Sequence, residues 1–357
     1  MQKKIIALAI ASAMTVPAMA FAAETTLTGQ VNMSYDMYKD GAAVETTTNR
    51  LNSNNTRLIW KGAEDLGTGL SAIWQMDIRY QADTGINTST SAVSNPDQLF
   101  AGNNYLGLKS DSMGTLMAGR FDAPYKVATR NLDVFYDVAG DNRSNSAAGI
   151  AGLLTHDARL NNELGYLSPD MSGFSVAAST VFGAESATNA VGNTKKGSEF
   201  SLAGMYNAGP IYGTLAYQDI KVGDIGTGDL GATGTAVADD KDTAMKLGGG
   251  YKTDAFVVNA LLEQTKYSHT LTGVEDKRTN YYIGAKFNVT PTDGIRAAYT
   301  KRGSTSGGNN DAGQYALGYE RSMSKTTSLY ATYVKTTDDT LNAPDPSAFS
   351  LGMKHSF

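Results

Sequence analysis

The chain has 357 residues, with 30 basic and 35 acidic side chains, 38 glycines, 19 tyrosines, three histidines and no cysteine. The missing cysteines exclude a disulfide scaffold and a thiolate metal site, and three histidines leave little material for metal or acid–base chemistry. The sequence lacks the several apolar runs of about 20 residues that a helical membrane protein needs, and its many aromatic and aliphatic residues argue against disorder.

Residues 1–22 are predicted to be a secretory signal peptide. Lys3 and Lys4 precede an apolar stretch, and Ala20-Phe21-Ala22 has the small-x-small pattern of a cleavage site. Removal of this segment leaves 335 residues with 28 basic and 35 acidic side chains, a net charge of −7. This negative charge argues against a nucleic-acid partner, which requires a basic face.

From residue 24 onward the sequence alternates with period two, which predicts strands with one apolar face. The first segment, 24–38, places the following residues on one parity: Leu27, Gly29, Val31, Met33, Tyr35 and Met37. The pattern recurs along the chain and closes it at Phe349, Leu351, Met353, His355 and Phe357. We expect about 16 such strands in a single domain, 23–357.

The connectors alternate between short and long. The short ones are 63–69, 110–114, 168–173, 208–210, 253–254 and 290–293. The long ones are 39–52, 83–98, 123–150, 184–197, 220–242, 268–278, 302–312 and 337–346. This alternation is typical of outer-membrane barrels. A secreted sandwich or solenoid also alternates, but tyrosines near strand ends and a polar second parity favour a transmembrane antiparallel β-barrel.

A sheet in lipid must close, because every backbone polar group needs a partner. Barrels of about 16 strands leave an aqueous channel. The longest connector, 123–150, is therefore predicted to fold inward as a constriction loop, the alternative being a surface loop.

Four stretches resemble the trimeric general diffusion porins of Gram-negative outer membranes: Thr56–Tyr80, Tyr105–Arg120, Arg159–Ser168 and the terminal Phe357. The resemblance covers nearly the whole mature chain. It implies an outer-membrane homotrimer that passes small hydrophilic solutes and ions and contacts lipopolysaccharide and other outer-membrane lipids. It further implies that assembly machinery recognises the last strand through Phe357, and that there is no cofactor, no metal and no enzymatic activity.

The resemblance also implies a constriction in which loop carboxylates face basic wall residues. The loop residues are Asp133, Asp137 and Asp141, and the basic wall residues are Arg57, Lys61, Arg79 and Arg159. Parity places Gln75 and Asp77 in the lumen as well. The family's second wall arginine falls near Gly102 or Asn104, neither of which is basic. The third falls near Ala151, or Arg143 or Arg159 takes its role. Three carboxylates against few arginines predict a mild preference for cations.

Two further interpretations are open, one of the loop aromatics and one of Arg120. Tyr125, Phe135 and Tyr136 could supply stacking faces for a sugar-selective porin of the same architecture. Arg120 shares the outward parity of Leu116 and Ala118, where an arginine at the bilayer midplane costs about 2–4 kcal/mol.

The resemblance implies a partner for Arg120 in loop 83–98 of a neighbouring subunit, through Asp83 or Asp97. The alternative partner is a lipopolysaccharide phosphate.

Overall fold

The computed structural model describes residues 24–84, 100–143, 148, 150–157, 159–182, 197–221, 240–268, 273–306, 308, 310–339 and 344–357. The predicted signal peptide and Asp97 lie outside these residues. Among the described residues, the structure has no helix long and apolar enough to cross a membrane.

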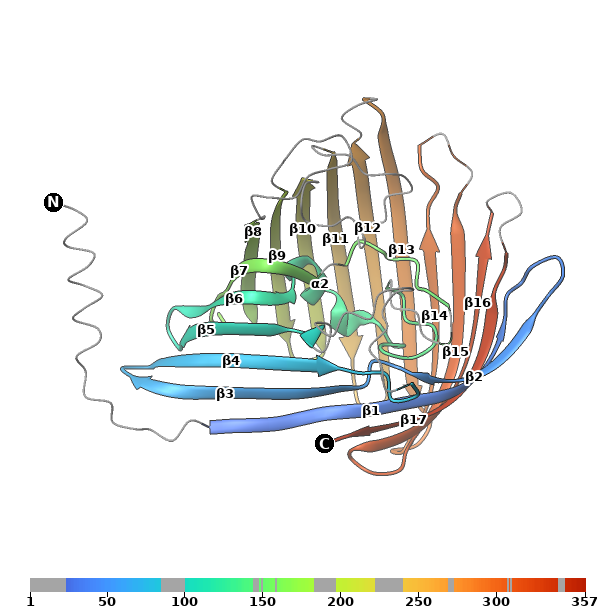
Figure 1. The fold of residues 1–357 in the computed structure, drawn as a ribbon, viewed down its shortest axis with the longest axis horizontal. Helices are drawn as coiled ribbons and strands as arrows, with labels where there is room; N and C mark the ends of the chain where they lie inside the picture. The colour runs from blue at the N-terminus through green and yellow to red at the C-terminus, as the bar shows by residue number, and fades with distance from the viewer. Residues whose placement is uncertain are drawn as a thin grey trace.

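The described chain is almost entirely antiparallel strand (Figure 1). The strands are β1 (Glu24–Lys39), β2 (Thr47–Ser53), β3 (Arg57–Gly67), β4 (Leu70–Arg79), β5 (Asn104–Ser110), β6 (Gly114–Asp122), β7 (Arg159–Leu167), β8 (Phe174–Phe182), β9 (Ser198–Ala208), β10 (Ile211–Lys221), β11 (Lys241–Lys252), β12 (Phe256–Ser268), β13 (Glu275–Asn288), β14 (Asp293–Arg302), β15 (Ala312–Ser322), β16 (Thr327–Asp338) and β17 (Ser347–Ser356). Two short helical turns, α2 (Pro124–Val127) and η2 (Arg130–Leu132), lie between β6 and β7.

The seventeen segments form a closed barrel of sixteen strands, because β2 and β3 are successive parts of one strand. Both pair with β1: β2 along 33–39 and β3 along 24–30. The break between them contains Asn55, whose φ is +56°. Pairing of β1 with β17 closes the ring. The predicted barrel of about 16 strands is confirmed, whereas the prediction that 39–52 is all loop is wrong at β2.

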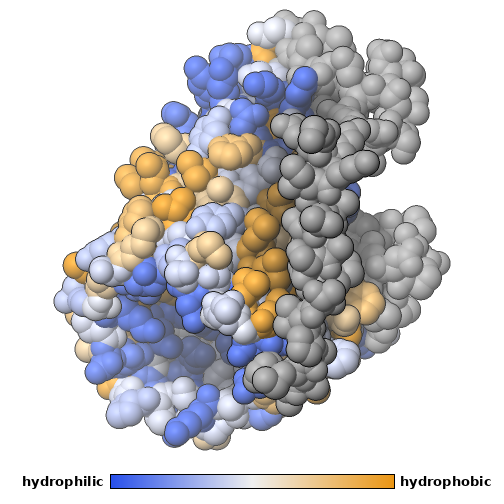
Figure 2. Space-filling model, turned by 90° about the vertical axis from the view of Figure 1, so that its left-hand side faces the viewer, coloured by the Kyte–Doolittle hydropathy of each residue, from blue (hydrophilic) through white to orange (hydrophobic). Residues whose placement is uncertain are grey.

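Side chains on neighbouring strands lie in register on two faces. Leu215, Leu247 and Leu262 are cross-strand neighbours on the outer face and are 54%, 58% and 50% exposed. The residues next to these leucines in each strand point inward. Among them, Lys246 and Glu263 are cross-strand neighbours, and both are buried. On the face shown in Figure 2, apolar side chains form a band between hydrophilic regions. This arrangement is that of a barrel whose outer face meets lipid.

The connector between β6 and β7 runs inside the ring of strands (Figure 1). It spans 123–158, eight residues more than the predicted 123–150, because β7 begins only at Arg159. Its apolar side chains Tyr125, Leu132 and Phe135 are 0–2% exposed. The part of the wall that contacts these side chains carries glycine: a Cβ on Gly248 of β11 would lie 2.6 Å from Leu132 Cδ1. The inward loop is therefore packed against the wall.

Candidate functional site

The constriction loop begins on the wall formed by β9–β12. Tyr125 packs against small side chains, including Ala216, and its backbone N–H donates to Ser201 Oγ at 2.9 Å. Its hydroxyl donates to Glu263 at 2.8 Å, and Asn259 donates to the carbonyl of Leu132 at 2.7 Å. These polar contacts fix the path of the loop along the inner wall.

Farther along, the loop crosses toward β14 and β15. The Phe135 ring lies 4.9 Å from the guanidinium of Arg296, which donates to the carbonyl of Val134 at 3.1 Å. A Cβ on Gly318 would lie 2.9 Å from the Phe135 ring. Phe135 therefore packs against the wall at a glycine, because a side chain at position 318 would occupy the same space.

The loop tip docks on the break between β2 and β3. Asp137, at φ +61°, accepts hydrogen bonds from the amides of Asn55 (2.7 Å) and Gln30 (3.3 Å). Asn32 donates to the Asp137 carbonyl at 2.8 Å. The Arg57 guanidinium lies 3.8 Å from the Asp137 carboxylate. The loop tip is therefore held by side-chain amides of β1 and of the break between β2 and β3.

The other two loop carboxylates are turned into the loop itself. Asp133 accepts the backbone N–H groups of Phe135 (2.8 Å) and Asn142 (2.9 Å), and burial raises its pKa to about 7, with the charge of Asp141 adding to the effect. Burial also acts to raise the pKa of Asp141. The adjacent guanidinium of Arg143, at 2.7 Å, outweighs this and holds that pKa below its usual range.

These contacts remove the basis of the predicted preference for cations. Asp133, Asp137 and Asp141 are 7%, 2% and 2% exposed, and Arg143 also lies 3.8 Å from Asp137. The prediction assumed three carboxylates facing the lumen with few partners. In the structure they bind donors within the loop and at its docking site, since a buried carboxylate without partners is costly.

In six ion pairs at the constriction the basic side chain is the more exposed member. The basic side chains are 10–29% exposed, against 1–3% for their carboxylate partners. We call these six side chains the basic layer: Arg57, Arg79, Lys126, Arg130, Arg143 and Arg159. The side facing the solvent is therefore positive, and the carboxylates Asp77, Asp122, Asp137 and Asp141 lie behind it.

The wall opposite the loop carries the remaining predicted lumen residues. Arg79 pairs with Asp77 at 3.2 Å, and Gln75 donates to the carbonyl of Asn103 at 3.1 Å. Lys61 is exposed and lies four residues along β3 from Arg57. A Cβ on Gly102 would lie 1.9 Å from Asp77 Cγ, so Asp77 fills the space that a basic side chain at 102 would need.

Asp122 is a residue that the sequence analysis missed. Its carboxylate lies 3.2 Å from Lys126, 3.1 Å from Arg130 and 2.9 Å from Arg159. The four-residue spacing from Asp122 to Lys126 was a visible signal, but it suggests a helical pair and not a site at the end of a strand. Arg159 also donates to the Asn103 side chain at 2.7 Å, which ties the returning strand to the wall.

The return arm of the loop is held by a second polar cluster on β11 and β12. His156 Nδ1 lies 3.4 Å from Asp242, and Lys246 bonds Asp157 and lies 3.4 Å from Glu263. Burial acts to lower the pKa of His156, but the charge of Asp242 outweighs it, and the pKa is raised. Asp242 is thus a buried counter-ion for the imidazolium form of His156.

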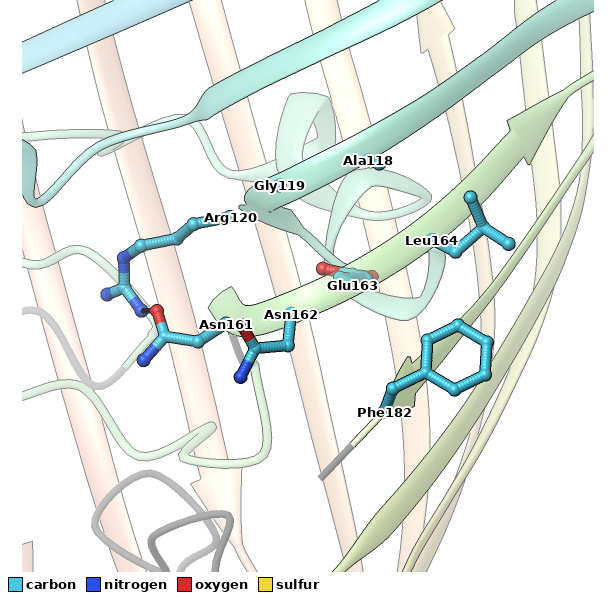
Figure 3. Close-up of a pocket in the computed structure, with 8 residues that line it drawn as sticks. All are labelled: Ala118, Gly119, Arg120, Asn161, Asn162, Glu163, Leu164 and Phe182. Atoms are coloured by element: carbon cyan, nitrogen blue, oxygen red, sulfur yellow. Dashed lines mark hydrogen bonds between the residues drawn. The ribbon is translucent and has the colours of Figure 1, made fainter. Parts of the chain in front are cut away.

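Arg120 lies on the outer side of β6, beside a hollow of about 730 Å³ at the irregular β6–β7 pairing. Figure 3 shows its guanidinium pointing to Asn161, whose oxygen accepts a hydrogen bond at 2.6 Å. Asp83 is exposed beyond the end of β4. Phe357 is 50% exposed on the outer face, and its backbone pairs with Gly29 in both directions, at 2.9 and 3.1 Å.

A closed antiparallel barrel with an apolar outer band and an inward loop is the architecture of an outer-membrane channel. The family described as Gram-negative porin matches residues 7–341, and the chain belongs to this family. It is therefore a protein of the Gram-negative outer membrane.

Curated relatives are also porins. The chain is 26% identical over 339 residues to an outer membrane porin protein of Bordetella pertussis, covering 85% of this chain and 83% of that one. It is 26% identical over 287 residues to outer membrane porin protein 32 of Delftia acidovorans, covering 78% and 73%.

Solved structures share the fold. The anion-selective porin from Comamonas acidovorans superposes with a TM-score of 0.73 at 21% identity, covering 94% of this chain and all of that one. An outer membrane protein of Vibrio cholerae, solved in a trimer form, superposes with a TM-score of 0.67 at 13% identity, covering 94% and 100%.

Proposed function

We propose that this porin is a general diffusion channel for small hydrophilic solutes and ions, and that its constriction favours anions. The observation that carries the proposal is the basic layer. Six basic side chains face the solvent, and the four carboxylates that pair with them are buried. In a narrow passage between low-dielectric walls, the charges nearest the solvent dominate the potential that an ion meets.

This proposal reverses the mild cation preference expected from the sequence. That expectation counted Asp133 as a full negative charge in the lumen, whereas Asp133 is buried and its pKa is about 7. The solved relative from Comamonas acidovorans is described as anion-selective, which supports the same sign here.

The test is the reversal potential of the purified protein in a planar bilayer under a potassium chloride gradient. We expect the sign of an anion-preferring pore, and Arg57→Ser should move it toward cations and widen the passage. The matched control is Arg321→Ser, because Arg321 lies at the end of β15 and its side chain is 54% exposed. A cation-preferring wild type would overturn the proposed sign and restore the expectation from the sequence.

A general channel is favoured over a sugar-selective one by the state of the three loop aromatics. Tyr125 and Phe135 are fully buried. The Tyr136 ring has the guanidiniums of Arg143 and Arg130 at 4.4 and 5.1 Å. Burial of two of the rings and these guanidinium contacts at the third argue against a stacking platform for a sugar ring. Titration with maltose and other oligosaccharides should therefore leave the current unblocked, and saturable block by one sugar would favour the alternative.

The other functional assignments remain proposals. We infer a homotrimer in which Arg120 meets Asp83 or Asp97 of a neighbouring subunit. The solved trimer form of the Vibrio cholerae protein supports that oligomeric state. We further propose that lipopolysaccharide surrounds the outer end and that assembly machinery recognises Phe357. The protein acts as a passive channel and not as an enzyme, and it matures by loss of residues 1–22.

A further inference from the structure

Asp122 lies where both ends of the constriction loop leave the barrel wall. It is the last residue of β6, and its partner in the strand ladder is Arg159, the first residue of β7. Its side chain is 1% exposed. A single carboxylate at this place contacts the strand that enters the loop and the strand that leaves it.

The carboxylate holds three separate elements. One oxygen lies 3.2 Å from Lys126 on α2 and 2.9 Å from Arg159 on β7. The other lies 3.1 Å from Arg130 on η2. Asn103, in the segment before β5, donates to the same oxygen at 3.3 Å. Both helical turns of the loop are thus fixed to the wall through Asp122.

The balance of charge around Asp122 is uneven. One negative group faces three positive ones, so the cluster carries a surplus of two positive charges. The side chains of Lys126, Arg130 and Arg159 are 15%, 29% and 11% exposed, so this surplus faces the solvent.

We propose that Asp122 is a positioning residue of the channel: it holds half of the basic layer in place and limits its net positive charge. The proposal rests on the proposed function as a diffusion channel, and it goes further by naming the group that sets the strength of selectivity. The alternative is that Asp122 only stabilises the loop, in which case its charge would not affect which ions pass.

The first test is Asp122→Asn, with Asp111→Asn as its control. Asp111 is exposed at the turn between β5 and β6, so its substitution removes the same charge far from the loop. A unit charge within about 8 Å of the ion path changes an ion's energy enough to alter permeability roughly twofold even in water. We therefore expect Asp122→Asn to raise the anion-to-cation permeability ratio about twofold or more, with increased current noise, and Asp111→Asn to change neither.

The double variant Asp122→Asn/Arg130→Gln separates charge from position. It restores the local net charge, so the permeability ratio should return toward that of the wild type while the current noise stays high. If Asp122→Asn does not assemble, the reversal potentials of the single variants Lys126→Gln and Arg130→Gln test the proposal. Each removes one surplus charge from a partly exposed side chain and should lower the ratio about twofold.

Reversal potentials that are equal for Asp122→Asn and Asp111→Asn would overturn the inference, as would unchanged potentials for both Lys126→Gln and Arg130→Gln. The proposed function has a different criterion, the sign of the wild-type potential. A cation-preferring wild type that still shifts toward anions in Asp122→Asn would refute the proposed sign and leave the role of Asp122 standing.

Discussion

Replacing Arg143 with alanine should release the tip of the constriction loop. Arg143 binds Asp141 through two nitrogens, at 2.7 and 3.1 Å, and lies 3.8 Å from Asp137. Its side chain is 10% exposed and that of Asp141 is 1% exposed. Removing one partner of a buried pair costs about 3–5 kcal/mol, because the other charge stays desolvated. We take the lower end, about 3 kcal/mol, because backbone N–H groups still bind Asp141. This corresponds to a roughly hundredfold rise in the population of the displaced tip.

The destabilisation of the loop tip in Arg143→Ala should become smaller as the pH falls. Without Arg143, burial raises the folded-state pKa of Asp133 and Asp141 above the unfolded value of about 3.9. Ionised carboxylates then destabilise the docked loop most above the folded pKa, and this penalty shrinks as the pH falls below that pKa and is gone only below the unfolded value. In the wild type the pKa of Asp133 is about 7 and that of Asp141 is lowered. The difference between the variant and the wild type should therefore shrink from pH 7.5 to pH 5.

Hydrogen–deuterium exchange of loop peptides, corrected for intrinsic rates at each pH, measures this opening. Arg143→Lys keeps the charge but not the two-nitrogen contact and should fall between the two. Arg321→Ala is the control, since its pair with Asp293 is exposed and such pairs contribute about 0–1 kcal/mol. Equal exchange in Arg143→Ala and the wild type at pH 7.5 would show that Arg143 does not hold the tip.

Three other predictions concern packing, assembly and oligomeric state. Gly248→Val should displace Leu132, because even a Cβ would lie 2.6 Å from it; single-channel conductance should rise, and an unchanged value would mean that the loop adapts. Deleting Phe357 removes the paired backbone at the seam, so the amount of inserted protein should drop severalfold while secretion continues; normal insertion would contradict this. Arg120→Ala should lower the temperature at which the native oligomer dissociates on a semi-native gel by several degrees, and a single-barrel mass for the wild type in mild detergent would refute the trimer.

The barrel could be predicted from the sequence because side-chain alternation follows from strand geometry alone. The number of strands was visible in this way, although the turn between β15 and β16 was not among the predicted connectors. β2 was not visible, because its sequence TTNRLNS contains a single large apolar residue, Leu51, and resembles a polar loop. The left-handed conformation of Asn55, which separates β2 from β3, has no signal in the pattern.

The sequence identifies charged residues that lie at the constriction, but it does not show where their side chains point. The sequence identifies Asp133, Asp137 and Asp141 as loop carboxylates, but the direction of Asp137 depends on donors far away in the chain, Gln30 and Asn55. Asp133 and Asp141 turn toward donors within the folded loop itself. The same limit hid Asp122, whose partner Arg159 becomes a neighbour only when the loop returns to the wall. Selectivity depends on that direction, so its sign could not be read from composition.

The docking site of the loop spans the seam at which the barrel closes. The tip binds β1 and the break before β3, while Ala148 and Ile150 pack with Val334 and Ala348 on β16 and β17. These surfaces become neighbours only after β1 has paired with β17. We therefore expect the ring to shut before the loop settles fully during biogenesis, so that the newly closed barrel first has a wider bore. Completion of the seam is thus also what allows the loop to make the pore restrictive.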